Sequence, residues 1–291
     1  MSQIVMISHD EWGAVPAAEA VAAAVPALES GDLLRLSRLR FAVAPEEASL
    51  FTSAILGSSK NASFDPASGR LGGTTATGAD AETLRRLMRR FSDAAASLVS
   101  QLLPPYRRQL TRGRASFRPA EIEGRVTSWR KDDTRLHIDS FPATPTGGRR
   151  ILRVFTNVNP DGRPRTWRIG GDFDAAAVRF AGSLRLPLPG LGHLLALIRV
   201  TKTRRTAYDA LMLQLHDLMK ADQDFQTRSP QTKADFPSGS TWVAFTDQVS
   251  HAATAGQYQL EQTFLLPVDA MLDESRSPLR ILERMIGKRL N

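Results

Sequence analysis

Three residues in this chain of 291 residues have the types and spacing of a metal site: His137, Asp139 and, far downstream, His251. Two imidazoles and one carboxylate are the donor set of mononuclear non-haem Fe(II) sites, where they occupy one face of an octahedral ion and leave the opposite face open. Alternate side chains of a strand point the same way, so a strand over residues 135–141 would direct His137 and Asp139 together. Because a His-x-Asp triplet often arises by chance, the surrounding sequence has to support this prediction.

The composition restricts the kinds of site and protein that are possible. The chain has no cysteine, which excludes disulfides and thiolate metal sites, so a bound metal would need histidine and carboxylate ligands. An apolar fraction of 42% is typical of a globular protein, and the length allows one large domain or two small ones, of which we expect a single domain over residues 1–291. No run reaches the roughly 18 to 20 apolar residues that span a bilayer. The N-terminus has early acidic residues and no basic region before an apolar stretch, so we expect no signal peptide and a cytoplasmic protein.

The net charge of +8 and the isoelectric point near 10.4 indicate an anionic partner. Nucleic acid, anionic lipid and a charged small substrate all satisfy this condition, so the charge alone does not choose between them. Arg85, Arg86, Arg89 and Arg90 gather on one face of a predicted helix. That face either binds anions or is simply solvated.

Hydrophobic spacing predicts the elements that must position the three side chains. From Ala81 to Leu102 apolar residues recur at helical spacing, and Pro104 stops the run, so we expect a helix that supports a sheet. The segments at 57–80 and 226–235 read as loops, of which the first either serves a site or is an excursion of no consequence. A short helix is expected from residue 46. Strand-like runs lie at residues 39–43, 117–119, 126–129, 135–141, 150–160, 165–171, 237–245 and 257–266.

The run at 150–160 is the clearest predicted strand, and its alternation is informative. One face carries Leu152, Val154, Thr156 and Val158, and the other carries Arg153, Phe155, Asn157 and Asn159. An arginine and two asparagines on one side of an otherwise apolar strand indicate a polar cavity, although an edge strand would show the same pattern.

Two helical regions are expected in the second half of the chain. The first is an insert at about 186–225, in which Thr206 can cap a helix and His216 reads as a packing or surface histidine. The second is a basic amphipathic helix at about 277–290, with Ser277 as its cap. This helix either lies on an anionic membrane surface or packs against the body of the protein.

Long stretches of this sequence resemble a known family. The strings HIDSFPATPTGGRRILRVFTNVNP, RTWRIGG, KTRRTAYDALMLQLHDLMK and STWVAFTDQVSHAATAGQYQLEQTF are similar to the lipopolysaccharide Kdo 3-hydroxylases, where Kdo is 3-deoxy-D-manno-octulosonic acid. The likeness covers residues from about 28 to 266. It implies an α+β fold with a double-stranded β-helix core (jelly-roll, cupin-like), buttressed by helices and carrying a helical insert before the last core strands. It also implies an Fe(II)/2-oxoglutarate-dependent dioxygenase that hydroxylates the 3-position of Kdo in Kdo-lipid A.

The resemblance implies that His137, Asp139 and His251 hold Fe(II), with 2-oxoglutarate and O2 as co-substrates. Many relatives place a cation for the distal carboxylate of 2-oxoglutarate about ten residues after the last histidine. This chain has Leu-Glu-Gln-Thr at residues 260–263 and no cation there. We therefore expect Arg153 to bind that carboxylate, because a guanidinium pairs with it in bidentate fashion. The alternative for Arg153 is an ion pair with an acidic neighbour.

Five further residues are candidates for the co-substrate or the acidic sugar. Asn157 and Thr263 are expected helpers of Arg153, and Arg118, Arg165 and Trp167 follow as candidates, with plain core packing as the alternative for Trp167. A lipid-linked sugar acid would explain the basic charge and the apolar helices, which could dock a cytoplasmic enzyme on the inner-membrane surface. No nucleic acid partner is expected. A dioxygenase acting on another anionic substrate and a non-catalytic basic binding module remain as alternatives.

Overall fold

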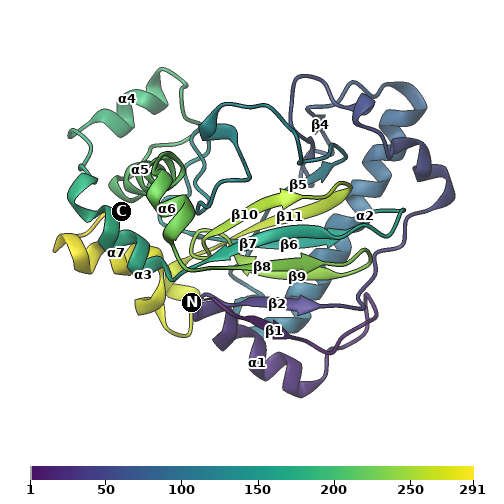
Figure 1. The fold of residues 1–291 in the computed structure, drawn as a ribbon, viewed down its shortest axis with the longest axis horizontal. Coiled ribbons are helices and arrows are strands. Elements are labelled where there is room, and N and C mark those ends of the chain that lie inside the picture. Colours follow the sequence, from purple (N-terminus) through teal and green to yellow (C-terminus); the bar gives the residue numbers. More distant parts are fainter. Residues whose placement is uncertain (1) are drawn as a thin grey trace.

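The structure is a computed structural model that describes residues 2–291, and its strands form two sheets (Figure 1). The large sheet has the strand order β1-β2-β9-β6-β11-β5-β3-β4, and the small sheet has the order β10-β7-β8. The strands are β1 (Ile4–Met6), β2 (Leu33–Leu36), β3 (Ala62–Phe64), β4 (Leu71–Gly72), β5 (Thr111–Arg118), β6 (Arg150–Asn157), β7 (Arg165–Gly170), β8 (Gln231–Phe236), β9 (Thr241–Phe245), β10 (His251–Ala255) and β11 (Gln259–Leu266).

The large sheet is mixed, because β1 and β2 run parallel whereas its other described pairs are antiparallel. In the small sheet, β7 pairs antiparallel with both β10 and β8. Along the chain β5 and β6 belong to the large sheet, β7 and β8 to the small one, and β9, β10 and β11 alternate between the two. The predicted α+β class is confirmed by this arrangement together with the helices.

The helices lie at the periphery of the sheets (Figure 1). The longest, α2, contacts β3, β5 and β11, and its regularly spaced apolar residues from Leu84 to Leu102 are buried, as the sequence predicted. The helices are α1 (Ala18–Glu29), α2 (Gly78–Leu102), α3 (Phe173–Phe180), α4 (Leu191–Leu197), α5 (Ala207–Ala221), α6 (Gln223–Arg228) and α7 (Pro278–Ile286). None of the helices within residues 2–291 combines the length and apolar character needed to cross a membrane.

The alternation predicted for β6 separates two apolar clusters. Leu152 and Val154 are buried in the larger cluster, which also contains the apolar face of α2. Phe155 points the other way, into a smaller cluster with Trp167 and Trp242. Phe155 stacks on Trp242 with 5.3 Å between ring centroids, and Trp167 meets Trp242 edge-on at 5.6 Å. The second face of β6 therefore looks toward the small sheet, and this is the face that carries Arg153.

The region between β7 and β8 contains α3, α4, α5 and α6, of which α4 and α5 lie within the bounds 186–225 given above for a helical insert. Thr206 forms a capping box with Asp209 at the start of α5, and Ser277 caps α7 by accepting a hydrogen bond from the backbone N–H of Arg280. The apolar face of α7 is buried within the larger cluster. Of the two readings of the C-terminal helix, packing against the body is the one the structure shows.

Several predicted boundaries are wrong. Residues 39–43 form no strand, and 126–129 is irregular up to a short 3-10 turn at Trp129–Lys131. The expected loop at 57–80 contains β3, β4 and the first turn of α2, and the expected loop at 226–235 contains most of β8. The strand β8 escaped prediction because it is an edge strand of the small sheet, and exposed edge positions such as Lys233 and Asp235 make its composition polar.

Candidate metal centre and the adjoining pocket

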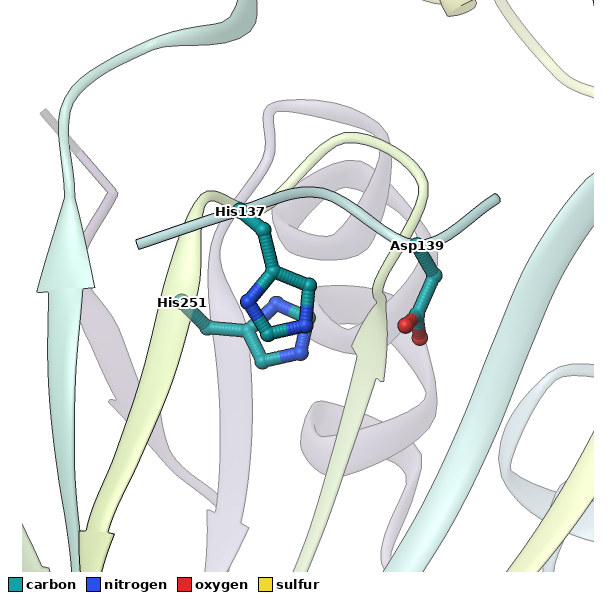
Figure 2. Close-up of side chains that lie close together, drawn as sticks. All are labelled: His137, Asp139 and His251. Atoms are coloured by element: carbon teal, nitrogen blue, oxygen red, sulfur yellow. The ribbon is translucent and has the colours of Figure 1, made fainter. Parts of the chain in front are cut away.

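The three predicted metal ligands lie together in the structure. One donor atom from each of His137, Asp139 and His251 can be chosen so that the three lie within 4.8 Å of one another. Figure 2 shows both rings and the carboxylate directed into the same space from two chain segments. Among the residues described, this is the one group of three or more His, Asp or Glu side chains close enough to hold a metal ion.

Backbone pairing between two distant segments brings the ligands together. The N–H of His137 donates to the carbonyl of His251 at 3.0 Å, and the N–H of His251 donates back at 2.8 Å. The N–H of Asp139 donates to the carbonyl of Thr246 at 2.7 Å. The predicted strand over residues 135–141 is thus reduced to an isolated bridge at His137, which adds one rung to the edge of the small sheet at β10.

The hydrogen bonds of the two imidazoles fix their tautomers. Nδ1 of His137 lies 2.7 Å from the carbonyl oxygen of Arg135, and Nδ1 of His251 lies 2.8 Å from that of Val249. Because a carbonyl can only accept, each Nδ1 must carry the proton, and each Nε2 keeps a lone pair for a metal. Burial lowers the pKa of both histidines, which keeps the rings neutral and able to coordinate.

The carboxylate of Asp139 is held in its charged form. Burial alone would raise its pKa, but the Arg153 guanidinium beside it holds that pKa below its ordinary value. Nε of Arg153 lies 3.2 Å from Oδ2 of Asp139, and this buried oxygen has no hydrogen-bond partner within the described chain. Two neutral imidazoles, an ionised carboxylate and a buried oxygen with a free lone pair fit a divalent cation such as Fe(II).

Arg153 also belongs to a chain of alternating charges. Its Nη1 donates to Oε1 of Glu261 at 2.8 Å, and Oε2 of Glu261 accepts from Nε of Arg118 at 3.0 Å. Arg118 lies 3.7 Å from Asp133, which in turn pairs with Lys60 at 3.0 Å. The ion pair with an acidic neighbour, given above as the alternative for Arg153, is therefore present.

A cavity of about 470 Å³ adjoins the metal ligands. Four of the six predicted co-substrate residues line it: Arg118, Arg153, Arg165 and Trp167. The other two do not. Asn157 donates from Nδ2 to the carbonyls of Arg163 and Phe236, and Thr263 is absent from the lining. The rest of the lining, which sequence reasoning did not single out, is Lys60, Asn61, Asp133, Ser140, Phe141, Pro142, Phe155, Ala253, Gln259 and Glu261.

Arg165 differs from the other cations of this pocket. It is buried, its Nη1 donates to the carbonyl of Gly256 at 2.7 Å, and its Nε has no hydrogen-bond partner among the described residues. Burial, with repulsion from Arg118, lowers its pKa to about 9. Within residues 2–291 it forms no ion pair with a carboxylate, whereas Lys60, Arg118 and Arg153 each form one. The pocket thus contains one buried guanidinium whose charge is not matched by a neighbouring carboxylate.

Gly256 is required for this placement. Its φ is +108°, and a Cβ there would lie 2.8 Å from the carbonyl of Pro164 and 2.9 Å from Cα of Arg165. Any larger residue would push the turn away from Arg165 and remove the carbonyl that its guanidinium contacts.

Two aromatic rings surround the ligands. Trp167 stacks on the ring of His251 with 5.0 Å between centroids, and its indole Nε1 has no hydrogen-bond partner in the described part of the chain. It therefore packs in the core and also borders the pocket. His216, predicted to be a packing or surface histidine, contacts the ring of His137 edge-on at 5.4 Å and hydrogen-bonds to Asp217 through Nδ1.

Some of the missed pocket residues carried a usable signal. Glu261 lies opposite Phe155 and Gln259 lies opposite Asn157, so a predicted pairing of β11 with β6 in this register would have placed Glu261 diagonally beside Arg153. The pocket residues Lys60 and Asn61 come from the segment read as a loop, and nothing in their local sequence indicated where that loop would lie.

Comparison with known proteins defines the class to which this fold and site belong. The model of the 3-deoxy-D-manno-oct-2-ulosonic acid (Kdo) hydroxylase family matches residues 11–289, and the chain belongs to this family. Crystal structures of the Kdo hydroxylase KdoO, a non-haem Fe(II) alphaketoglutarate-dependent dioxygenase, are 44% identical over 99% of this chain and 97% of theirs. The TM-score is 0.96 for the complex with cobalt(II) and for the complex with alphaketoglutarate and Fe(III), and 0.95 for the complex with succinate and Fe(III). No curated protein sequence matches the chain.

Proposed function

We propose that this protein is an Fe(II)/2-oxoglutarate-dependent dioxygenase that hydroxylates the 3-position of Kdo in Kdo-lipid A, converting 2-oxoglutarate to succinate and CO2. The observation that carries the proposal is the convergence of His137, Asp139 and His251 beside a basic pocket. The relatives with cobalt(II), Fe(III), alphaketoglutarate and succinate bound support the same chemistry.

The order of the strands supports a double-stranded β-helix. In the large sheet β5, β11, β6 and β9 are consecutive neighbours, and in the small sheet the bridge at His137 extends the order β10-β7-β8. Taken along the chain, these segments cross between the two sheets as they do in a jelly roll. In this assignment His137 and His251 lie at the edge of the small sheet, Asp139 lies beside the end of β9, and residues 1–291 act as one dioxygenase domain with the helices as its buttress.

The protein side chains bind and orient, and the bound Fe(II) with 2-oxoglutarate and O2 supplies the oxidising chemistry. His137 and His251 present Nε2 lone pairs whose direction is fixed by the carbonyls of Arg135 and Val249. Arg153 steers the carboxylate of Asp139 from 3.2 Å. The rings of Phe155 and Trp167 line one side of the pocket and exclude water from it.

Arg165 is our candidate for the distal carboxylate of 2-oxoglutarate. It has no carboxylate partner among residues 2–291, so an incoming carboxylate would complete a pair without breaking one. Arg118 and Arg153 border the same pocket and add positive charge around the co-substrate, although Glu261 offsets part of it. The free indole N–H of Trp167 offers a further donor.

The substrate that fits the basic charge of the chain is a sugar acid linked to a phosphorylated lipid. We propose that the enzyme meets this substrate by peripheral contact with the cytoplasmic face of the inner membrane. The C-terminal helix α7 is not the element that makes this contact, because its apolar residues are buried against the body.

The test of the function is a mass measurement on Kdo-lipid A. We expect the substrate to gain one oxygen atom, with equimolar succinate, only when Fe(II), 2-oxoglutarate and O2 are all present. Transfer of oxygen to another anionic acceptor but not to Kdo-lipid A would show that the proposed substrate is wrong and that the proposed enzyme class is right. Absence of iron-dependent succinate release with every acceptor would contradict the class itself.

A further inference from the structure

The segment around α4 presents apolar side chains to solvent instead of to the core. We define the α4 segment as residues 186–205. Leu188 and Leu197 are 77% and 79% exposed, and Leu194, Ile198 and Val200 are each more than half exposed. No residue of α4 is buried. In Figure 1 this helix lies at the edge of the molecule, away from both sheets.

The contrast with α7 shows that this exposure is not a general property of the helices. In α7 the residues Leu279, Ile281 and Leu282 are almost completely buried. Exposed large apolar residues elsewhere, such as Val15 and Leu272, lie singly in separate connecting segments. An exposed apolar patch with several leucines typically marks a surface that binds a membrane or another protein.

The charges of the α4 segment indicate which kind of apolar partner this surface binds. No aspartate or glutamate occurs between Asp174 and Asp209, while the segment itself contains Arg199, Lys202, Arg204 and Arg205. None of these four cations pairs with a carboxylate within residues 2–291. Exposed apolar side chains flanked by unpaired cations match an interface between acyl chains and anionic headgroups.

The segment is fastened to the rim of the metal pocket. The N–H of Lys202 donates to the carbonyl of Ala143 at 2.9 Å, and the guanidinium of Arg205 donates to the carbonyl of Pro142. Pro142 and its neighbour Phe141 line the pocket. Whatever surface the α4 segment contacts therefore comes to lie beside the pocket that holds the predicted ligands.

We propose that the α4 segment is an interfacial membrane anchor. Its leucines, Ile198 and Val200 enter the boundary of a bilayer that contains anionic lipid, and its cations contact the headgroups. The anchor holds the pocket beside the headgroup layer, where a lipid-linked sugar acid is reached without leaving the membrane. This last point rests on the proposed function, whereas the anchoring itself does not. A second copy of the chain is a poorer occupant, because it would bring the same unpaired cations face to face.

Co-sedimentation of the full-length protein with vesicles tests the anchor. The vesicles contain phosphatidylcholine with roughly 30% phosphatidylglycerol, to supply the anionic surface that the cations require. We expect the double variant Leu194→Gln/Leu197→Gln to bind them at least about tenfold more weakly than the wild type, since both side chains would enter the interface. The double variant Lys202→Gln/Arg204→Gln should lose the preference for anionic over neutral vesicles.

The matched control is Val15→Gln/Leu272→Gln, which removes two exposed apolar side chains from other parts of the chain and should leave vesicle binding unchanged. Equal binding by the wild type and the Leu194→Gln/Leu197→Gln variant would overturn the anchor. A wild-type dimer in sedimentation velocity that this variant abolishes, without any vesicle binding, would also overturn it and assign the surface to a second copy.

A turnover measurement separates failure of the anchor from failure of the proposed function. With Kdo-lipid A in vesicles, the Leu194→Gln/Leu197→Gln variant should hydroxylate about tenfold more slowly than the wild type, in line with its weaker binding. With the deacylated sugar in solution, both proteins should be equally active. If neither substrate is hydroxylated while vesicle binding still depends on Leu194 and Leu197, the anchor stands and the substrate assignment fails.

Discussion

Two arginines of β6, Arg150 and Arg153, show how similar ion pairs serve different ends. Arg150 is 0% exposed and pairs with Asp247, 1% exposed, at 2.8 Å. It also donates to Gln248 and lies over the ring of Phe245, so its surroundings are closed. Arg153 lies three residues further along and faces the pocket, where it contacts Asp139 at 3.2 Å. One pair is enclosed by the core, and the other borders a space that a ligand can enter.

The carboxylates of the two pairs respond in opposite ways. Burial raises the pKa of Asp247 in spite of Arg150. At Asp139 the neighbouring Arg153 guanidinium outweighs burial and lowers the pKa. The two carboxylates therefore shift in opposite directions although each has an arginine beside it. Asp139 is thus prepared to remain an anionic ligand, whereas Asp247 serves packing within the fold.

The largest effect should come from breaking the enclosed pair. Arg150→Leu leaves the buried carboxylate of Asp247 without its cation, and removing one partner of a buried pair costs about 3–5 kcal/mol. Denaturant unfolding of the metal-free protein measures this loss. Arg153→Leu is the matched control on the same strand and should lose clearly less stability. Equal losses would remove the distinction between the two pairs.

Replacing the unpaired cation of the pocket should impair co-substrate binding. Arg165→Leu removes a charge-assisted contact worth about 1.5–3 kcal/mol, so the KM for 2-oxoglutarate should rise roughly 10- to 150-fold. Steady-state succinate release measures the change, and Arg165→Lys should recover part of it because the charge is kept. An unchanged KM in Arg165→Leu would transfer the role to Arg118 or Arg153.

Removing the open pair should weaken the metal site. Arg153→Leu leaves Asp139 without the guanidinium that orients it, and losses of such outer partners typically lower metal affinity about 10- to 100-fold. Titration of the metal-free protein with Co(II) measures the affinity. Glu261→Gln is a milder companion, because it keeps a hydrogen-bond acceptor for Arg153. Wild-type affinity in Arg153→Leu would show that Asp139 needs no such support.

The remaining effect concerns pH. Burial lowers the pKa of His137 and His251 below the ordinary value of 6.5. Below that pH these two histidines are therefore protonated in the unfolded chain but remain neutral in the folded protein. The metal-free protein should therefore lose stability as the pH falls below about 6.5, by up to about 1.4 kcal/mol per pH unit for each histidine. Unfolding at pH 7.5 and 5.5 measures the difference. His137→Gln/His251→Gln should show a smaller one, and an equal slope would attribute the effect to other groups.

The sequence predicted features that depend on local periodicity. The two faces of β6, the cap of α5 at Thr206 and the burial of α2 all follow from the spacing of side chains within one element. The His-x-Asp pair and His251 were found because ligand chemistry limits the residue types. The site's remaining contacts depend on pairing between distant strands, as between Arg153 and Glu261, which no local pattern encodes.

Other features depend on what lies next to an element. The sequence did not distinguish the α4 segment from α7, since both carry apolar and basic residues, and only packing shows that the helix α4 is exposed whereas the apolar face of α7 is covered. Likewise, Arg165 and Arg118 are equivalent in the sequence, but Glu261 pairs with Arg118 and leaves Arg165 without a carboxylate. The sequence therefore indicates which side chains could bind a ligand, but it does not show which of them already pair with another residue of the protein.

Metal titration is the most direct test of the central claim, that His137, Asp139 and His251 hold one ion. Co(II) added to the metal-free protein should saturate at one equivalent, and replacement of any one of the three ligands by alanine should abolish that binding while the far-ultraviolet circular dichroism remains native. Tight binding of one equivalent by all three alanine variants would place the metal elsewhere and contradict this account.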